Sequence, residues 1–311
     1  MQNNLAFVFP GQGSQSLAML ADFSDHEVVQ NTFSEASDAL GYDLWQLVQQ
    51  GPVEKLNQTN FTQPALLTAS VAIWRLWQAS SSVKPTILAG HSLGEYSALV
   101  CAGVFSLADA VKLVEKRGEF MQASVPAGTG AMYAIIGLAD DKIIEACAQA
   151  AQGEVVSAVN FNSPGQVVIA GNKAAVERAG ELCKEAGAKR ALPLPVSVPS
   201  HCALMKDAAD KLAEEFNNIT FNTPNISVVN NVDVAIESSA QAIKTALIKQ
   251  LYSPVRWTET IQYLAQNGVE QVIEAGPGKV LQGLLKRIDK TISCQSVNDS
   301  ASLTKALESV E

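Results

Sequence analysis

Residues 86–97 read TILAGHSLGEYS, and this stretch decides the fold because it places a serine between two glycines after a short apolar run. The run before the serine predicts a strand, and the pattern after it predicts a helix. The spacing Gly90-x-Ser92-x-Gly94 between a strand and a helix is typical of a nucleophile elbow, in which the serine occupies a tight, strained turn. Crowding of the backbone there favours glycine two positions before and two after. The stretch therefore predicts a nucleophilic serine in an α/β fold.

The chain before the elbow predicts a buried strand followed by a helical region. Residues 5–9 are apolar throughout, as in a strand that is covered on both faces. The loop at 10–15 contains two glycines, but their spacing is not that of a dinucleotide-binding fingerprint. Helical patterns continue to Trp77 and include a dense apolar helix at 65–78. Two strands joined through helices indicate a parallel sheet with right-handed crossovers.

A second pattern begins at about Pro126, where helices give way to alternating short elements. The order is strand, helix, strand, strand, helix, strand, which is the ferredoxin-like signature; the expected elements are 130–138, 140–152, 155–161, 166–170, 173–187 and 188–196. We therefore predict a parallel-sheet, α/β-hydrolase-like large domain at residues 1–125 and 198–311. A ferredoxin-like (βαββαβ) small domain at 126–197 is inserted into it.

The chain then returns to the large domain with alternating strands and helices. The pattern predicts a strand at 228–232, helices at 240–251 and 253–267, and a last core strand at 269–274. Gly278-Lys279 is not a P-loop, because the required glycine spacing and the following Ser or Thr are missing.

Composition indicates a protein that acts in the cytoplasm without nucleic acid or membrane partners. The net charge is −9 and is spread along the chain, which argues against nucleic acid binding. The most apolar helical stretch, 66–77, is too short to span a bilayer, and no signal peptide is evident. Five cysteines without a C-x-x-C spacing favour reduced thiols.

A serine nucleophile needs a base within hydrogen-bond reach, and the chain offers three histidines. We expect His26 to lie at the surface and His91 to point away from the serine, so His201 is the candidate base. Asp233 and Glu274 follow predicted strands and could orient its imidazole, and a backbone carbonyl is a further alternative.

Several motifs occur together in an order and spacing that resemble the malonyl-CoA:acyl carrier protein transacylases of bacterial type II fatty acid synthesis. The resemblance covers essentially the whole chain. It rests on residues 11–15 (GQGSQ), 90–95 (GHSLGE), Arg117, 160–163 (NFNS), 199–201 (PSH) and 276–278 (GPG).

The resemblance implies a role for each of five catalytic groups. Ser92 is the nucleophile, and His201 is the general base and then the general acid. The main-chain carbonyl of Gln250, rather than a carboxylate, orients the histidine. The backbone N–H groups of Gln12 and Leu93 form the oxyanion hole.

The resemblance also implies how the substrate is recognised. In the family, the arginine at the position of Arg117 binds the free carboxylate of the malonyl group. Arg117 lies near the end of a helix expected at 106–122, so the alternative is an exposed cation that interacts favourably with the helix dipole. Asn160 and Asn162 are expected to contact substrate. Ser200 stands where related malonyl-selective polyketide domains often have phenylalanine, which leaves room for methylmalonyl.

The implied substrates are malonyl-CoA and the phosphopantetheine arm of acyl carrier protein, with no metal or redox cofactor and a monomeric enzyme. Because both proteins are acidic, docking needs a local basic patch. Lys189-Arg190 and Lys286-Arg287 are candidates, and solvated surface cations are the alternative.

Two other function classes remain open from the residues alone. A serine esterase or thioesterase shares the elbow and the histidine, but it would normally have a carboxylate in its triad and gives Arg117 no role. A catalytically silent docking subunit of a larger synthase is the other, although an intact Ser92 and His201 argue against it.

Overall fold

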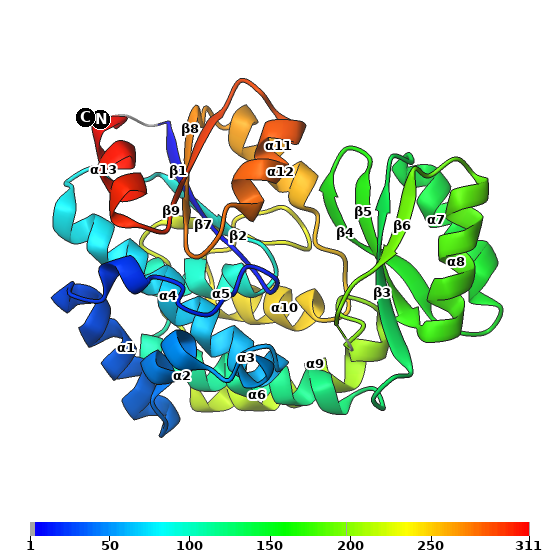
Figure 1. Cartoon of the computed structure of the whole chain (residues 1–311), viewed down its shortest axis with the longest axis horizontal. Helices are drawn as coiled ribbons and strands as arrows, with labels where there is room; N and C mark the ends of the chain where they lie inside the picture. Colours follow the sequence, from blue (N-terminus) through cyan, green and yellow to red (C-terminus); the bar gives the residue numbers. More distant parts are fainter. Residues whose placement is uncertain (1–3, 197, 311) are drawn as a thin grey trace.

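A computed structural model describes residues 4–196 and 198–310, and it contains two separate β-sheets (Figure 1). One sheet is parallel and is surrounded by most of the helices, while the other is antiparallel and carries two helices. The α/β class is therefore confirmed. The predicted domain boundaries stay a prediction, and their outermost residues 1–3, 197 and 311 lie outside the described residues.

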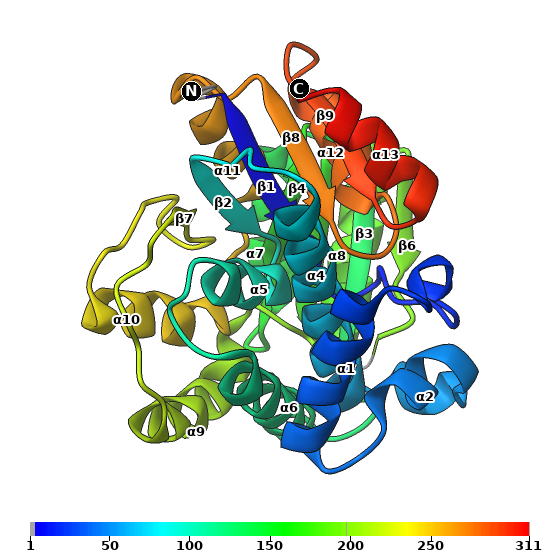
Figure 2. The ribbon, with the colours of Figure 1, turned by 90° about the vertical axis from the view of Figure 1, so that its left-hand side faces the viewer.

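The large sheet has five parallel strands in the order β7-β2-β1-β8-β9 (Figure 2). Their bounds are β1 Leu5–Phe9, β2 Ile87–Gly90, β7 Ser227–Val229, β8 Gln271–Ala275 and β9 Ser293–Val297. The sequence-based expectation that the sheet ends with residues 269–274 was wrong, because β9 adds an edge strand beside β8. The carboxyl ends of β1, β2 and β7 meet at one edge, where ligands bind in sheets of this kind.

Helices cover both faces of this sheet, and β1 shows why. Its side chains alternate, as the pleat requires: Leu5, Phe7 and Phe9 join one apolar cluster, while Ala6 and Val8 join another. The helices are α1 Glu27–Leu40, α2 Leu44–Gln50, α3 Val53–Leu56, α4 Thr59–Ser80, α5 Leu93–Cys101, α6 Leu107–Ala123, α9 Lys206–Glu215, α10 Ala240–Gln250, α11 Trp257–Gln266, α12 Val280–Ile288 and α13 Ser300–Glu308. Short 3₁₀ turns occur at Ala21–Phe23, Ala203–Met205 and Phe216–Asn218.

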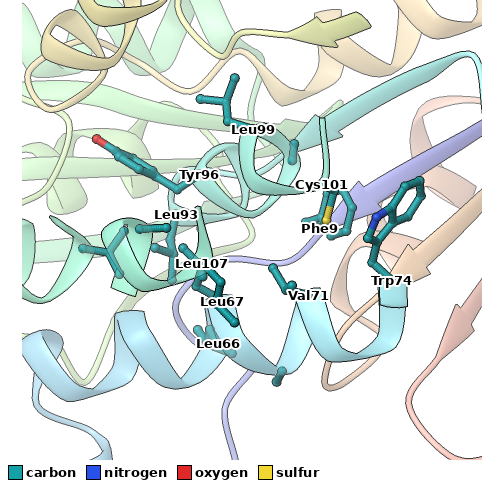
Figure 3. Close-up of a cluster of buried hydrophobic side chains, with 14 of the residues drawn as sticks. Phe9, Leu66, Leu67, Val71, Trp74, Leu93, Tyr96, Leu99, Cys101 and Leu107 are labelled. Carbon is teal, nitrogen blue, oxygen red and sulfur yellow. The ribbon is translucent and has the colours of Figure 1, made fainter. Parts of the chain in front are cut away.

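The elbow helix α5 is held in place by the long buried helix α4 (Figure 3). Leu67 of α4 lies close to Leu93 of α5, and Val71 of α4 and Phe9 at the end of β1 belong to the same cluster. Burying side chains of this size contributes about 1.5–3 kcal/mol each. Helix α4 begins six residues before its predicted start, with Pro64 inside it. This packing fixes the elbow against the centre of the sheet.

The small sheet has four antiparallel strands in the order β4-β5-β3-β6. Its elements are β3 Gly130–Ile136, α7 Asp140–Ala151, β4 Val156–Ser163, β5 Gln166–Asn172, α8 Lys173–Glu185 and β6 Arg190–Pro193. The order of elements matches the βαββαβ prediction, although β4 runs two residues further than expected. Helices α7 and α8 lie on the side away from the large sheet (Figure 1), so the opposite face is left to line a cavity.

Backbone hydrogen bonds join the small sheet to the large part of the chain. The N–H of Phe161 in β4 donates to the carbonyl of Val255 over 3.0 Å, and the N–H of Val255 donates to the carbonyl of Val159 over 2.8 Å. Paired backbone groups of this kind fix β4 relative to the large sheet. Across residues 4–196 and 198–310, no helix is both long enough and apolar enough to cross a membrane.

Candidate active site

Ser92 occupies a strained turn between β2 and α5. Its φ of 51° and ψ of −108° lie outside the ordinary regions for a residue with a side chain, which costs on the order of 1–3 kcal/mol. The flanking glycines are required by close backbone approach. A Cβ on Gly90 would lie 1.9 Å from the carbonyl carbon of Gly94, and a Cβ on Gly94 would lie 2.0 Å from the carbonyl oxygen of Phe9. The predicted strand–turn–helix unit is therefore confirmed.

His201 lies against the serine hydroxyl. Its Nε2 is 2.7 Å from Ser92 Oγ, and its Nδ1 is 2.7 Å from the carbonyl oxygen of Gln250. The backbone N–H of His201 donates to the carbonyl of Leu251 over 3.0 Å, so the end of α10 holds both the ring and the main chain of this residue. Because a carbonyl accepts only, Nδ1 carries the proton and Nε2 is free to accept one from the serine.

The environment keeps the imidazole neutral. Burial, first, and then the positive charge of the Arg117 guanidinium lower the pKa of His201 to about 3. A neutral imidazole is the form that can remove a proton from the serine. Among the described residues, neither Asp233 nor Glu274 is hydrogen-bonded to His201, whose Nδ1 bonds to the carbonyl of Gln250. Glu274 instead accepts hydrogen bonds from the backbone N–H groups of Leu281 and Gln282 at the start of α12.

Arg117 is buried beside the nucleophile, with 2% of its surface exposed, so the alternative of an exposed helix-end cation was wrong. Its Nη1 donates to Gln63 Oε1 over 2.7 Å, and its Nη2 donates to Gln250 Oε1 over 3.0 Å and to Ser92 Oγ over 3.3 Å. These partners are uncharged, and the buried Nε has no hydrogen-bond partner among residues 4–196 and 198–310. A buried cation that lacks a direct anionic partner is a binding site for an anion.

A cavity of about 110 Å³ opens over these groups. Strands of the small sheet form one part of its wall, and loops and helices of the large part of the chain form the rest. The lining residues are Gln12, His91, Ser92, Leu93, Arg117, Met121, Met132, Asn160, Leu194, Val196, Val198, Ser200 and His201. The loop after β1 thus meets the elbow here. Among the described residues, the backbone N–H groups of Gln12 and Leu93 donate no hydrogen bond, and these are the two donors expected to form an oxyanion hole.

The two asparagines expected to contact substrate lie in different surroundings. Asn160 lines the cavity, and its buried Oδ1 has no hydrogen-bond partner in the described part of the chain. Asn162 does not line it; its Oδ1 lies 2.8 Å from Nε2 of His91. His91 in turn lies against the ring of Trp257, and burial lowers its pKa. Asn162 therefore orients His91 in this structure, and a direct contact with substrate stays a prediction.

Two residues at the site were missed by the sequence-based reasoning. The Oδ1 of Asn231 accepts a hydrogen bond from the backbone N–H of Ser92 over 2.7 Å. Glu95 on α5 is fully enclosed, and burial raises its pKa to about 7. Asn231 could have been suspected because it follows the carboxyl end of the strand next to β2, whereas nothing in the sequence marks Glu95 as buried.

The arrangement can perform acyl transfer through a serine ester. It combines a strained serine, a neutral imidazole, two free N–H groups and a buried cation around one cavity. Within the described part of the chain, no group of three or more His, Cys, Asp or Glu side chains is placed to hold a metal ion. A larger hollow of about 550 Å³ beside α1 includes Phe33, Tyr42 and Trp45 in its lining but neither the serine nor the histidine.

Comparisons with known proteins agree with this chemistry. A sequence model described as the acyl transferase domain matches residues 6–305. The malonyl CoA-acyl carrier protein transacylase of Escherichia coli K12 is 65% identical over 304 residues, which cover 97% of this chain and 98% of that protein.

Solved structures give the same result. The acyl carrier protein S-malonyltransferase from Vibrio cholerae is 68% identical, with a TM-score of 0.96 over 97% of this chain and 99% of that one. A malonyl-transacylase in complex with its type II PKS acyl-carrier protein is 65% identical, with a TM-score of 0.97 over 98% of this chain and 99% of that one. The chain therefore belongs to the acyl transferase family and, within it, to the malonyl CoA-acyl carrier protein transacylases.

Proposed function

We propose that this protein transfers a malonyl group from malonyl-CoA to the phosphopantetheine thiol of acyl carrier protein, for fatty acid biosynthesis. The observation that carries the proposal is the buried guanidinium of Arg117, whose Nη2 lies 3.3 Å from the nucleophilic Oγ of Ser92. An acyl group that ends in a carboxylate can form an ester with the serine while its carboxylate pairs with this cation. A plain acetyl group would leave the cation without an anion.

The first half-reaction loads the serine. Ser92 Oγ attacks the thioester carbonyl carbon while Nε2 of His201 takes the hydroxyl proton. The negative oxygen of the tetrahedral intermediate accepts hydrogen bonds from the N–H groups of Gln12 and Leu93. The carbon–sulfur bond then breaks, and His201 returns its proton to the departing sulfur. CoA is released, and the malonyl group remains as an ester on Ser92.

The second half-reaction reverses these steps with a different thiol. The phosphopantetheine sulfur attacks the ester carbonyl, and His201 takes the thiol proton. When the carbon–oxygen bond to the enzyme breaks, His201 gives this proton to Ser92 Oγ, which restores the free enzyme. Because these residues supply nucleophile, base and charge stabilisation, the proposal needs no metal or redox cofactor. We also propose that the protein acts in the cytoplasm and that it is a monomer.

The test is the intact mass of the protein after mixing with malonyl-CoA alone, and then after adding phosphopantetheinylated carrier protein that has a free thiol. We expect a gain of one malonyl group that persists until phosphopantetheinylated acyl carrier protein is added, and we expect the group to appear on the carrier. Rapid release of free malonate without carrier would favour a thioesterase instead. A protein that never gains mass would support the silent docking subunit.

Geometry also supports a docking patch for the acidic carrier. Arg190 begins β6 opposite Ile136 of β3, and Ile136 pairs with Gln166 of β5 on its other side. The guanidinium of Arg287 on α12 donates to the side-chain oxygen of Gln166. The two basic pairs named from the sequence, Lys189-Arg190 and Lys286-Arg287, therefore lie together where α12 meets the small sheet.

Reversing one charge of each pair, with Arg190→Glu and Arg287→Glu in one variant, should raise KM for the carrier protein. We expect a rise on the order of tenfold or more at low salt, because electrostatic attraction speeds encounter and is screened by ions. KM for malonyl-CoA should change less than twofold. The matched control reverses two exposed lysines, Lys142 on α7 and Lys305 on α13, and carries the same net charge. Equal effects on both substrates, or in both variants, would refute the patch.

A further inference from the structure

Both backbone polar groups of Ser92 are held by side chains that come from a distant part of the chain. The N–H donates to Asn231 Oδ1 over 2.7 Å, and the carbonyl accepts from Gln250 Nε2 over 3.0 Å. The two side chains come from a loop and a helix more than 130 positions further along the sequence. The nucleophile is therefore fixed by tertiary contacts as well as by its own turn.

Asn231 holds the turn at two points. It lies two residues after β7, the strand that pairs with β2, and it is fully buried. Its Nδ2 donates to the carbonyl of Gly90 over 2.6 Å, while its Oδ1 accepts from Ser92. Using both ends of one amide, it fixes the separation of Gly90 and Ser92 across the elbow. It also occupies the N–H of Ser92, so that group is not available to an oxyanion.

Glu95 connects Asn231 to Gln250. Its Oε2 accepts from the backbone N–H of Asn231 over 2.9 Å and from Gln250 Nε2 over 2.8 Å. Gln250 in turn accepts from Nη2 of Arg117 through its Oε1. One buried carboxylate therefore fixes the two side chains that hold Ser92, and one of these also positions the guanidinium.

We propose that Glu95 and Asn231 are positioning residues for the acyl-transfer reaction, and we call the pair the elbow clamp. The proposal rests on the proposed function in taking Ser92 as the nucleophile. A non-glycine residue at φ 51° persists only where its surroundings over-determine it. Without the clamp, the serine relaxes from this conformation and Oγ moves away from Nε2 of His201, to which it is now 2.7 Å distant.

The reaction is sensitive to this geometry. A misplacement of about 1 Å costs on the order of 100-fold in rate. Neither clamp residue lines the cavity over Ser92. Loss of the clamp is therefore expected to slow the attack by Ser92 while leaving the binding of malonyl-CoA nearly unchanged. A residue that serves only stability would instead lower the amount of folded protein and leave the rate per folded molecule unchanged.

The first test uses Asn231→Ala and two reagents. We expect single-turnover formation of malonyl-serine, normalised to folded protein, to slow about 100-fold, with KM for malonyl-CoA within about threefold. Labelling by a fluorophosphonate should slow by a similar factor. This reagent reacts with the free, activated serine, so it reports on Ser92 independently of which acyl group the enzyme transfers. Asn230→Ala is the control, because Asn230 is also buried but, among the described residues, its side chain accepts hydrogen bonds only from the N–H groups of Val232 and Asp233 in its own loop.

The outcomes separate the two proposals. Wild-type protein that reacts with the fluorophosphonate but not with malonyl-CoA would overturn the proposed function. The elbow clamp would still be tested by comparing the fluorophosphonate labelling rates of wild type and Asn231→Ala. Equal fluorophosphonate rates in wild type and Asn231→Ala would overturn the clamp. Equal losses in Asn231→Ala and Asn230→Ala would also overturn it, since the effect would then belong to the loop.

The second test uses conservative rescue at Glu95 and does not depend on the Asn231 variant folding. In Glu95→Ala the N–H of Asn231 and the amide of Gln250 lose their acceptor, so we expect a fluorophosphonate rate about 100-fold below wild type. In Glu95→Gln one amide oxygen can accept from both donors, and we expect the rate to stay within about tenfold of wild type. A Glu95→Ala protein that keeps the wild-type rate per folded molecule would overturn the proposal.

Discussion

Replacing Ser92 with alanine should abolish formation of the malonyl-enzyme and lower malonyl transfer by a factor on the order of 10⁴ or more. The reason is chemical. Without Oγ there is no ester, and Nε2 of His201, now 2.7 Å from that oxygen, has no hydroxyl proton to take. The remaining oxyanion donors and the cation can still bind malonyl-CoA, so affinity for the substrate is expected to remain. Intact mass after incubation with malonyl-CoA measures formation of the malonyl-enzyme, and radioactive malonyl-CoA measures transfer of the malonyl group.

The matched control for this variant is Ser97→Ala. Ser97 lies on the same helix α5 and is fully buried, and none of the described residues is a hydrogen-bond partner of its hydroxyl. Removing that hydroxyl should leave labelling within about twofold of wild type, since it deletes no contact and creates little space. A Ser92→Ala protein that still carries radioactive malonate on another side chain would contradict the assignment of the nucleophile.

Local patterns were enough to predict the elements that position Ser92. Strand β1 and strand β2 are short apolar runs that end in glycine-containing turns, and both features act within a few residues. Strand β9 was missed because its sequence, Ser293–Val297, is half polar and lies at the edge of the sheet. The helix expected at 65–78 starts too late, because proline is typical of the first turn of a helix. In the structure Pro64 lies inside α4, which packs against α5 and α6.

The same distinction holds within the site. The pairing of Ser92 with His201 could be anticipated because only three histidines were available. The carbonyl of Gln250 has no sequence signature, since every residue carries one; the family resemblance suggested it, and the distance of 2.7 Å to Nδ1 comes from the fold. The burial of Arg117 depends on Gln63 from α4 and Gln250 from α10, which no local pattern brings together.

Replacing Arg117 with alanine should remove the preference for malonyl over acetyl thioesters. In the wild type the malonyl carboxylate can take two charge-assisted hydrogen bonds from the guanidinium, whose buried Nε has no partner. Charge-assisted bonds of this kind are worth about 1.5–3 kcal/mol each, so losing two of them is expected to lower kcat/KM for malonyl-CoA by a factor on the order of 10² to 10⁴. For acetyl-CoA kcat/KM should change little, because no anion is lost. Initial rates with both thioesters at equal pH measure the ratio.

Arg117 also affects the base, and this effect gives a second, independent readout. Burial first, and then the charge of Arg117, lower the pKa of His201 to about 3. Since imidazole is active when unprotonated, the acidic limb of kcat/KM should move to higher pH when the cation is removed, for either thioester. Arg117→Lys keeps a charge but not the planar fork, so it should retain the wild-type pH limb while recovering only part of the malonyl preference. Arg75→Ala removes an ion pair between Arg75 of α4 and Glu35 of α1. It should change neither the malonyl preference nor the pH of the acidic limb. An unchanged ratio of malonyl to acetyl kcat/KM in Arg117→Ala would count against the carboxylate site, whatever happened to the pH limb, because the two readouts depend on different contacts of the same guanidinium.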